Sequence, residues 1–443
     1  MASIKLFGSS SGGKHVAPRG SGSEKEIKTA KRSAAHDAPE AGKKKRGKLS
    51  PARRIISILM VLVILAGLYI FAVYTQIPAI KKLRDAYIET AMYTHTHTWL
   101  AEWFIPRPVI DDVLARIQQA NESQEGIKSN WDTKPTPAPT PTPVPKSPEE
   151  IAEDNFYETF WELDKDSFLE YLEAHPEVKE QGWDNIYINE AGLDDSGTSM
   201  KTIFDEQVLA IDAKNKIMLI RVGGTGFIGV LAVAKDPAQL RCCAADGIGQ
   251  YGQVLEGIVT DNKGVLGITG NGFEDDGGAG NGGQIAGFTM CSGQEYGWHY
   301  ISQRKRIELR ENNRLYVTDT LAAVDPTCTD ASEFGPALIC DGELLVDQFS
   351  AYSSIQPRAC LGQSEREEIL MLVIEGRHIG RSIGTGVASC AEILKLHEGY
   401  QAMNLDGGTS AVMWYDGEYV TKCSNTAILC RYLPNAWVYG YTN

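Results

Sequence analysis

The chain has 443 residues, with 57 Asp and Glu against 43 Lys and Arg, and a formal net charge of −14. The charge is uneven: residues 1–54 hold 14 Lys and Arg and 4 Asp and Glu, so this segment carries +10 and the remainder about −24. The acidic remainder excludes nucleic acid as its partner, because neutralising phosphates requires clustered Lys and Arg.

The first segment, residues 1–54, is rich in Ser, Gly, Lys and Ala and has little to bury, so we predict a disordered basic tail. A membrane-spanning helix is predicted next, over residues 55–78. No charged residue occurs from Ile55 to Ile80. As a helix, the apolar stretch Ile55–Val73 would span about 28 Å, which is close to the thickness of the hydrocarbon layer.

A cleaved signal peptide is the alternative interpretation of this apolar run. The run is longer than the apolar part of a signal peptide, and no small-residue cleavage pattern follows it. Basic residues lie mainly before the run, among them Lys43–Arg46, Arg53 and Arg54. By the positive-inside rule the tail is cytoplasmic and the rest extracytoplasmic, so we expect a single-pass protein of the cell membrane with lipid as one partner.

Residues 79–132 are predicted to form an extracytoplasmic helical stalk, because apolar residues recur there at intervals of three and four. Residues 133–148 hold seven prolines and are predicted to be an extended linker. We interpret this linker as a spacer that holds the outer domain away from the membrane. Residues 149–196 are predicted to be a helical lead-in, with two amphipathic helices that end at His175-Pro176.

Residues 197–443 are predicted to form the outer, catalytic-type domain. Short β-rich runs such as QVLAID, FIGVLAVA and EILMLVIEG alternate there with Gly, Asp and Asn, and one helix is expected over Gly386–His397. Asp416-Gly417 between AVMWY and EYV indicates a hairpin. The predicted fold class is α+β, a strand-rich mixed-sheet domain with few helices, preceded by the transmembrane helix and the stalk.

All nine cysteines lie beyond the apolar run, where an extracytoplasmic location permits disulfides. Cys423 with Cys430, and Cys328 with Cys340, are plausible pairs by their separation. An odd number leaves at least one thiol unpaired within the chain, and the connectivity stays open.

Two segments match known motifs, but the predicted strands and helices around them do not fit those motifs. Gly224–Gly229 (GTGFIG) fits the dinucleotide-binding pattern, but a strand follows it instead of a helix that could hold a pyrophosphate, so we predict a hairpin. Gly380–Gly384 (GRSIG) fits the nucleophile elbow, but Ser382 does not directly follow a strand, and His397 and Asp406 come in the wrong order. A serine hydrolase is therefore only a minor alternative.

A stronger pattern is spread over several places. In Asn404–Ser410 (NLDGGTS), two glycines directly after Asp406 allow a tight turn and the close approach of a ligand, although an ordinary turn has the same composition. Arg358 precedes the buried strand EILMLVIEG and Arg377 follows it. An arginine at each end of one strand suits the binding of a phosphate or carboxylate, with surface salt bridges as the alternative. The segment TGNGF opens a glycine-rich loop.

Together, GITGNGF, QPRACLG, VIEGRHIG, GVASCAEILKLH and QAMNLDGGTSAVMW resemble the phosphodiester glycosidase family. Its members include the uncovering enzyme that removes N-acetylglucosamine from mannose 6-phosphate diesters, and bacterial proteins associated with exopolysaccharide. The resemblance runs from about Gly197 to the C-terminus. This chain has Thr409 where the family usually has a third glycine, Glu375 where it has Asp, and Thr269 where it has Asn.

The resemblance implies a hydrolase that cleaves a sugar 1-phosphate diester, with an N-acetylglucosamine-like sugar, in cell-surface or extracellular polysaccharide metabolism. Such a reaction needs carboxylates near the anomeric carbon and cations on the phosphate. We therefore expect Asp406 as the leading catalytic carboxylate, with Glu375 in support. The phosphodiester would be held by Arg358 and Arg377. The remaining expected substrate-binding residues are Asn404, Gly407, Gly408, Thr409, Ser410, Asn271 and Phe273.

The sequence implies no cofactor, except that Asp275 and Asp276 in the glycine-rich loop are weak candidates for Ca²⁺ ligands without the regular spacing of such sites. The alternative function is a non-catalytic glycan-binding or assembly protein for exopolysaccharide or cell wall. Thr269 in place of Asn keeps this alternative open. Such a protein would bind the diester and not turn it over.

Overall fold

The structure is a computed structural model that describes residues 50–94, 97–133, 146–275, 279–299, 304–346 and 352–441. Most of the expected basic tail and of the proline-rich linker lies outside these residues. The chain divides into two units, Met1–Leu62 and Val63–Asn443. The described part of the first unit is the beginning of one helix, and everything below concerns the second unit unless that helix is named.

Helix α1 (Pro51–Tyr74) is, among the described residues, the one helix that is long and apolar enough to cross a membrane. It begins with proline, whose missing N–H needs no partner in the first turn of a helix. The other helices of the described chain are α2 (Pro78–Met92), α3 (Trp99–Glu102), α4 (Arg107–Ser123), α5 (Pro148–Thr159), α6 (Lys165–Ala174), α7 (Pro176–Lys179), α8 (Leu255–Asp261) and α9 (Val387–Leu396).

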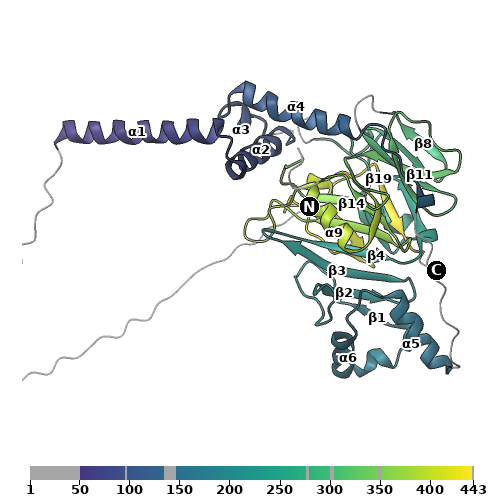
Figure 1. Cartoon of the computed structure of the whole chain (residues 1–443). Coiled ribbons are helices and arrows are strands. Elements are labelled where there is room, and N and C mark those ends of the chain that lie inside the picture. The colour runs from purple at the N-terminus through teal and green to yellow at the C-terminus, as the bar shows by residue number, and fades with distance from the viewer. Residues whose placement is uncertain are drawn as a thin grey trace, which may run out of the picture. The chain divides into compact units, whose positions relative to one another are not determined.

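Several of these helices lie where the apolar periodicity predicted them (Figure 1). Ser147 caps α5 in a reciprocal arrangement with Glu150, and the Asp164 side chain accepts a hydrogen bond from the first turn of α6. Helix α6 stops before Pro176, which then begins α7.

Three antiparallel sheets make up the strand-rich part. The central sheet has the order β1 (Tyr187–Asn189), β2 (Gln207–Asp212), β3 (Ile217–Gly224), β4 (Phe227–Ala234), β15 (Ile369–Ile374), β14 (Arg358–Ser364), β16 (Gly399–Asn404), β12 (Ala337–Cys340) and β13 (Glu343–Leu344). The second sheet is β10 (Leu315–Asp319), β9 (Lys305–Arg310), β11 (Cys328–Phe334), β7 (Phe288–Cys291) and β8 (Gln294–Gly297). The third is β18 (Glu418–Tyr419), β17 (Met413–Tyr415), β6 (Leu266–Thr269), β19 (Asn435–Tyr439) and β5 (Leu240–Ala244).

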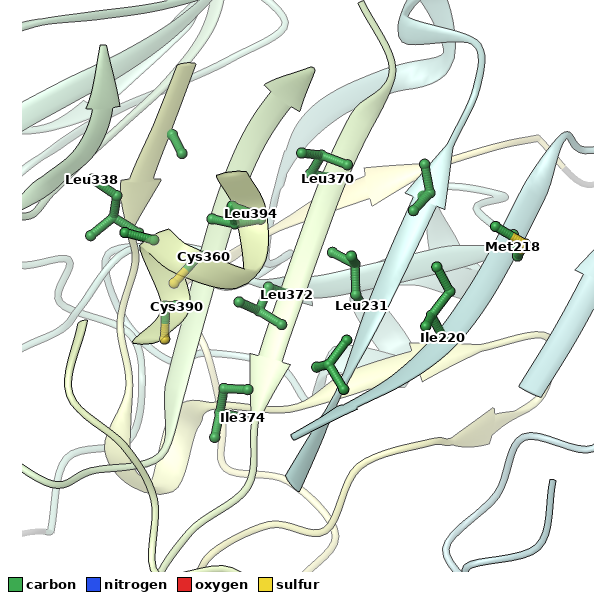
Figure 2. Packing of buried hydrophobic residues seen from close by; sticks show 14 of the residues in the cluster. Met218, Ile220, Leu231, Leu338, Cys360, Leu370, Leu372, Ile374, Cys390 and Leu394 are labelled. Carbon is green, nitrogen blue, oxygen red and sulfur yellow. The ribbon is translucent and has the colours of Figure 1, made fainter. Parts of the chain in front are cut away.

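The central sheet is buried on both faces, which explains the continuous apolar runs of its strands. Successive residues of β4 point to opposite faces, so Leu231 packs on the helical side and Val230 on the side of the two smaller sheets. On the helical side, Leu394 and Cys390 of α9 lie over β14 and β15 (Figure 2). The α+β fold class predicted from the sequence is confirmed.

Both hairpins expected from glycine motifs are present. Strands β3 and β4 pair antiparallel around Gly226, which has a φ of 83°, so the dinucleotide-like motif is a hairpin as predicted. Strands β17 and β18 are joined by Asp416 and Gly417, and both have positive φ. This backbone conformation is typical of Asp-Gly hairpin turns.

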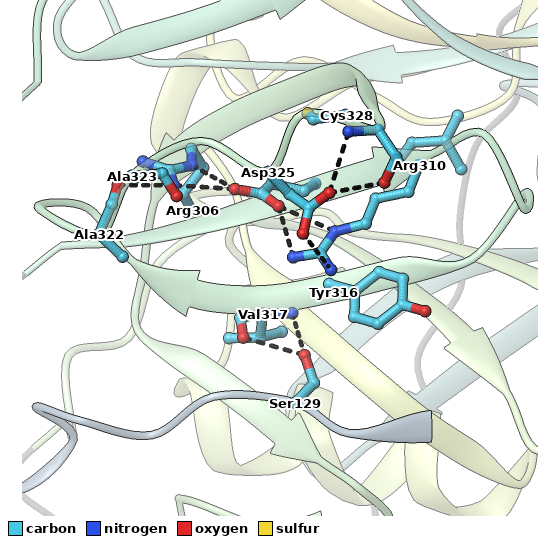
Figure 3. Close-up of polar contacts among 12 residues, drawn as sticks. Ser129, Arg306, Arg310, Tyr316, Val317, Ala322, Ala323, Asp325 and Cys328 are labelled. Atoms are coloured by element: carbon cyan, nitrogen blue, oxygen red, sulfur yellow. Dashed lines mark hydrogen bonds and ion pairs between the residues drawn. The ribbon is translucent and has the colours of Figure 1, made fainter. Parts of the chain in front are cut away.

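The segment after α4 lies on the second sheet. Ser129 exchanges hydrogen bonds with the backbone of Val317 (Oγ to O 2.9 Å, N to Oγ 2.6 Å; Figure 3), and Trp131 Nε1 donates to Leu315 O at 2.8 Å. After the proline-rich segment, a buried ion-pair cluster joins Glu162, between α5 and α6, to Lys235 at the end of β4.

Both flanks of the proline-rich segment therefore contact the same domain. This arrangement differs from the stand-off spacer expected from composition, because the chain before the segment has already reached the sheets.

All nine cysteines are free thiols in the structure, so neither disulfide suggested by the sequence is formed. Cys328 lies on β11 of the second sheet and Cys340 on β12 of the central sheet. For this pair, sequence separation is a poor guide because the two residues belong to different sheets.

Candidate active site

A cleft of about 940 Å³ opens where loops that follow several strands meet. The loop after β16 carries Asp406, the loop after β6 carries Phe273, and the turn after β15 carries Arg377. The backbone N–H of Asp406 donates to the carbonyl of Gly270 at 3.2 Å, which ties the first two loops together. Motifs far apart in the sequence thus reach one place.

The two glycines after Asp406 are required by their surroundings. A Cβ on Gly407 would lie 2.7 Å from the carbonyl oxygen of Pro357. Gly408 has a φ of 58°, and a Cβ there would lie 3.2 Å from Nη2 of Arg377. A side chain at position 407 would push the loop with the carboxylate away from Pro357, and one at position 408 would push it away from Arg377.

Asp406 is half-buried in the cleft wall, and desolvation there raises the pKa of its carboxyl to about 6. A hydrogen bond from Ser410, the positive charge of Arg431 and the N–H of Gly407 (3.0 Å to Oδ1) act in the opposite direction and lower this pKa. Desolvation is the larger effect. A carboxyl that titrates near pH 6 in a cleft is a candidate for proton transfer or for charge stabilisation.

Arg358 and Arg377 both line the cleft and donate to neutral oxygens. Arg358 donates to Ser354 O (2.7 Å), Ser354 Oγ (2.9 Å) and Thr385 O (3.1 Å). Arg377 donates to Thr409 Oγ1 (3.1 Å) and Gln356 Oε1 (2.7 Å).

In the part of the chain that the structure describes, neither guanidinium lies within 4.0 Å of a carboxylate. Desolvation by the cleft walls lowers the pKa of both groups, which is a cost that a bound anion would relieve.

The sequence suggested an arginine at each end of one strand, but the two arginines lie near the same end of the neighbouring strands β14 and β15. Arg358 begins β14, and its backbone pairs with Ile374 at the end of β15, because these strands are antiparallel. The chain then turns, and Arg377 adopts a left-handed φ of 64°, a conformation that a non-glycine residue keeps only when its surroundings impose it. The antiparallel pairing is what brings the arginines together.

Two further arginines, Arg304 and Arg431, line the cleft and were missed from the sequence. Arg431 donates to both carboxylate oxygens of Asp275 (2.6 and 2.9 Å) and lies over the ring of Phe273 at 4.7 Å. Arg304 donates to Ala286 O at 2.7 Å. No local motif marks either residue, since Arg304 belongs to a basic run and Arg431 follows a cysteine near the C-terminus.

Glu375 and Asn271 do not line the cleft. The Glu375 carboxylate accepts hydrogen bonds from Arg381 (2.5 and 3.1 Å) and from the N–H of Lys422 (2.9 Å). Asn271 is fully buried, and its Nδ2 donates to the carbonyls of Phe288 (3.0 Å) and Glu333 (3.1 Å). Both side chains hold neighbouring segments in place.

The other expected substrate-binding residues do line the cleft. Asn404 lies at the end of β16, where its Nδ2 donates to Gly335 O at 2.9 Å. Thr409 accepts a hydrogen bond from Arg377, and the ring of Phe273 packs under Arg431. The lining residues shared with the sequence prediction are Asp406, Arg358, Arg377, Asn404, Gly407, Gly408, Thr409, Ser410 and Phe273.

Helices α2 and α4 supply a wall of the cleft that the sequence did not indicate. Glu89 and Tyr93 come from α2 and its C-terminal end, and Asn121 comes from α4. The Glu89 carboxylate accepts from Ser353 N (2.6 Å) and Ser353 Oγ (2.8 Å), and burial raises its pKa. Tyr352 donates through its hydroxyl to Asn121 Oδ1 at 2.6 Å, which fastens the wall to the sheet domain.

The calcium candidates gain no support from their positions. Both oxygens of Asp275 are held by Arg431, whose charge opposes a cation there, and Asp276 lies outside the described residues. Among the residues described, no group of three or more His, Cys, Asp or Glu is arranged to hold a metal ion.

The Ser382 hydroxyl is buried and donates to Glu375 O at 2.6 Å while accepting from Ile228 N at 3.2 Å. These bonds give Ser382 a structural role in the turn after β15. They argue against the serine hydrolase alternative, because a nucleophile must be accessible to substrate.

The family comparison matches the part of the chain that carries these loops. Residues 262–439 match the model of the phosphodiester glycosidase family. This part of the chain resembles the phosphodiester glycosidases. The match includes the loops with Phe273, Arg377 and Asp406, whereas the wall with Glu89 and Asn121 lies outside it. The resemblance predicted from the motifs is confirmed.

Among solved structures, the chain is similar to the catalytic domain of zebrafish N-acetylglucosamine-1-phosphodiester alpha-N-acetylglucosaminidase, described as auto-inhibited by its pro-peptide. The identity is 15%, the TM-score is 0.42, and the similarity covers 51% of this chain and 82% of that one. A hypothetical protein from Synechocystis is similar at 14% identity and a TM-score of 0.36, over 51% of this chain and 62% of the other. A search of curated proteins found no match.

Proposed function

We propose that the chain is a hydrolase of glycosyl phosphodiesters. The observation that carries the proposal is the meeting, in one cleft, of a carboxyl with a pKa of about 6 and two arginines that pair with no carboxylate in the described chain. The match of residues 262–439 to the phosphodiester glycosidases supports the same class of reaction.

The arginines would bind the phosphate of the diester. Arg358 and Arg377 bring planar donor groups into the cleft from the same end of β14 and β15, which suits bidentate binding of phosphate oxygens. Arg304 adds a third positive charge to the cleft. With its charge held in this way, the phosphate leaves as a phosphomonoester anion and needs no proton from an acid.

Asp406 would act on the sugar. Of the three carboxylates that line the cleft in the described chain, Asp275 is paired with Arg431, and Glu89 lies outside the residues that match the family, which leaves Asp406 as the candidate. In its ionised form it would stabilise the positive charge that develops at the anomeric carbon. Water supplies the hydroxyl that this carbon gains, and the bond between the carbon and the phosphate oxygen breaks with its electrons on that oxygen. The second proton of the water passes to the released phosphomonoester or to bulk water.

Glu375 takes a positioning role in this proposal. It fixes Arg381 and the backbone of Lys422 beside the turn that carries Arg377, and it does not reach the cleft. Its effect on the reaction would pass through Arg377.

The sugar, by resemblance to the family, is N-acetylglucosamine-like, and the setting is cell-surface or extracellular polysaccharide metabolism. We further propose that α1 anchors the chain in a membrane, with the basic N-terminal tail in the cytoplasm and the cleft outside. The length and apolar composition of α1 support the anchor, and the basic residues before it support the orientation.

The test is the release of free sugar from N-acetylglucosamine 1-phosphate diesters by the purified full chain. The Asp406→Asn variant should lose this activity, and Asp246→Asn, an exposed position outside the cleft, is the matched control. Binding of the diester without release in the wild type would favour the glycan-binding alternative. If the wild type neither binds nor hydrolyses the diesters of several sugars, both the hydrolase and the glycan-binding alternative are refuted.

A further inference from the structure

Exposed aromatic side chains gather around α3. Trp99, Trp103 and Phe104 have exposed fractions of 41%, 76% and 53%, and the two indole rings lie 5.2 Å apart. We call these three residues the aromatic turn. Three adjacent large apolar groups with this exposure are typical of an interaction surface.

The aromatic turn lies beside the end of the apolar helix. The hydroxyl of Tyr69 in α1 donates to the carbonyl of Phe104 at 2.6 Å. Tyr69 is five residues before the last residue of α1, Tyr74, and this separation corresponds to about 7.5 Å along the helix. The headgroup layer on one side of a bilayer is roughly 5–7 Å deep. If the end of α1 meets the membrane surface, the aromatic turn therefore lies at the level of the headgroups, where Trp and Tyr are enriched.

A basic pocket of about 390 Å³ adjoins the same end of α1. It is lined by Lys81, Arg84 and Arg116, together with Asp112. Asp85 lies 2.8 Å from one nitrogen of each of the three cations. Three cations against two carboxylates leave a surplus of positive charge. This surface fits a phospholipid bilayer, because the cations can bind the phosphates of the headgroups while the indoles contact the upper part of the acyl chains.

We propose that the aromatic turn is a second membrane contact, in which Trp99, Trp103 and Phe104 enter the outer interface of a phospholipid bilayer next to α1. The inference rests on the proposed role of α1 as the anchor. A single helix attaches the domain to the membrane but leaves its tilt free. A second contact beside the helix would fix the tilt as well. Helix α2 leads from this end of α1 to the cleft wall, and its 15 residues span about 22 Å. The cleft is thereby held close to the membrane surface.

The experiment uses the full chain in vesicles of phosphatidylcholine and phosphatidylglycerol, with or without lipids brominated on the acyl chain near the carbonyl. Tryptophan emission reports contact with the bromine. Two of the eight tryptophans belong to the turn, so quenching should remove up to about a quarter of the emission. The double variant Trp99→Phe/Trp103→Phe keeps the apolar surface and should lose the quenched part. Trp298→Phe, an exposed position after β8, should keep it.

Equal emission with and without bromine in the wild type, or equal quenching in the wild type and the double variant, would overturn the proposal. If a second copy of the chain covered the turn, the emission of the wild type would shift to the blue without quenching, which also overturns it. Alkaline extraction of the vesicles tests the anchor separately. If the chain resists extraction but its emission is not quenched, α1 is the anchor and the second contact is refuted. If the emission is quenched but the chain is extracted, the second contact holds and the anchoring by α1 is refuted.

Discussion

Replacing Asp406 with Asn should stabilise the fold at neutral pH while it removes activity. The cleft raises the pKa of this carboxyl from 3.8 to about 6, and each unit is worth about 1.4 kcal/mol, so holding the group ionised costs about 3 kcal/mol. Asn needs no ionisation and avoids this cost. The free energy of unfolding at pH 7.5 should rise by up to about 3 kcal/mol, or roughly 5 °C in Tm.

The pH dependence gives the sharper test. Because the folded pKa lies above the unfolded value, the contribution of Asp406 to stability is present below about pH 4 and is lost as pH rises through 6. Thermal unfolding of the wild type and Asp406→Asn should therefore agree at pH 4 and separate by pH 7, with Asp246→Asn following the wild type throughout. A variant that is no more stable than the wild type at pH 7.5, or a difference that persists at pH 4, would refute the reasoning.

Four further predictions concern the cleft and its supports. Activity of the wild type on a sugar 1-phosphate diester should rise as pH passes through about 6, since Asp406 acts ionised; a flat profile from pH 5 to 7 would contradict this. Arg377→Ala should raise KM by about 10- to 100-fold through lost hydrogen bonds to the phosphate, and an unchanged KM argues against the contact. Glu375→Gln should loosen Arg381 and, through Arg377, lower kcat/KM. Glu375→Asp keeps the carboxylate and should restore part of the activity. Lys235→Met should cost about 3–5 kcal/mol in urea unfolding, since it leaves two buried carboxylates unpaired.

Local patterns predicted the elements whose causes are local. Helix α9 follows from its apolar periodicity, the turn at Asp416-Gly417 from backbone preferences, and the loop with Asp406 from its glycines. These features arise within about ten residues of chain, so a single sequence contains them.

Residues that depend on distant partners could not be predicted in this way. Glu375 was expected at the cleft because it stands where the resembled family usually has Asp, but its carboxylate accepts hydrogen bonds from Arg381. Arg431 and Glu89 reach the cleft only through the pairing of sheets and the packing of helices far along the chain. Antiparallel pairing of β14 and β15 likewise decided where Arg358 lies.

Under the proposed anchoring by α1, the contacts on both sides of the proline-rich segment decide which proteolytic cuts could release the domain from the membrane. A protease that cut between residues 133 and 146 would break the chain into two pieces, but Trp131 and the helices before it would stay attached to the sheets through their hydrogen bonds. Such a nick would therefore not release the domain. A soluble form would require a cut in the short connection between α1 and α2, from Thr75 to Ile77, and a fragment that began after the prolines would lack the cleft wall of Glu89 and Asn121.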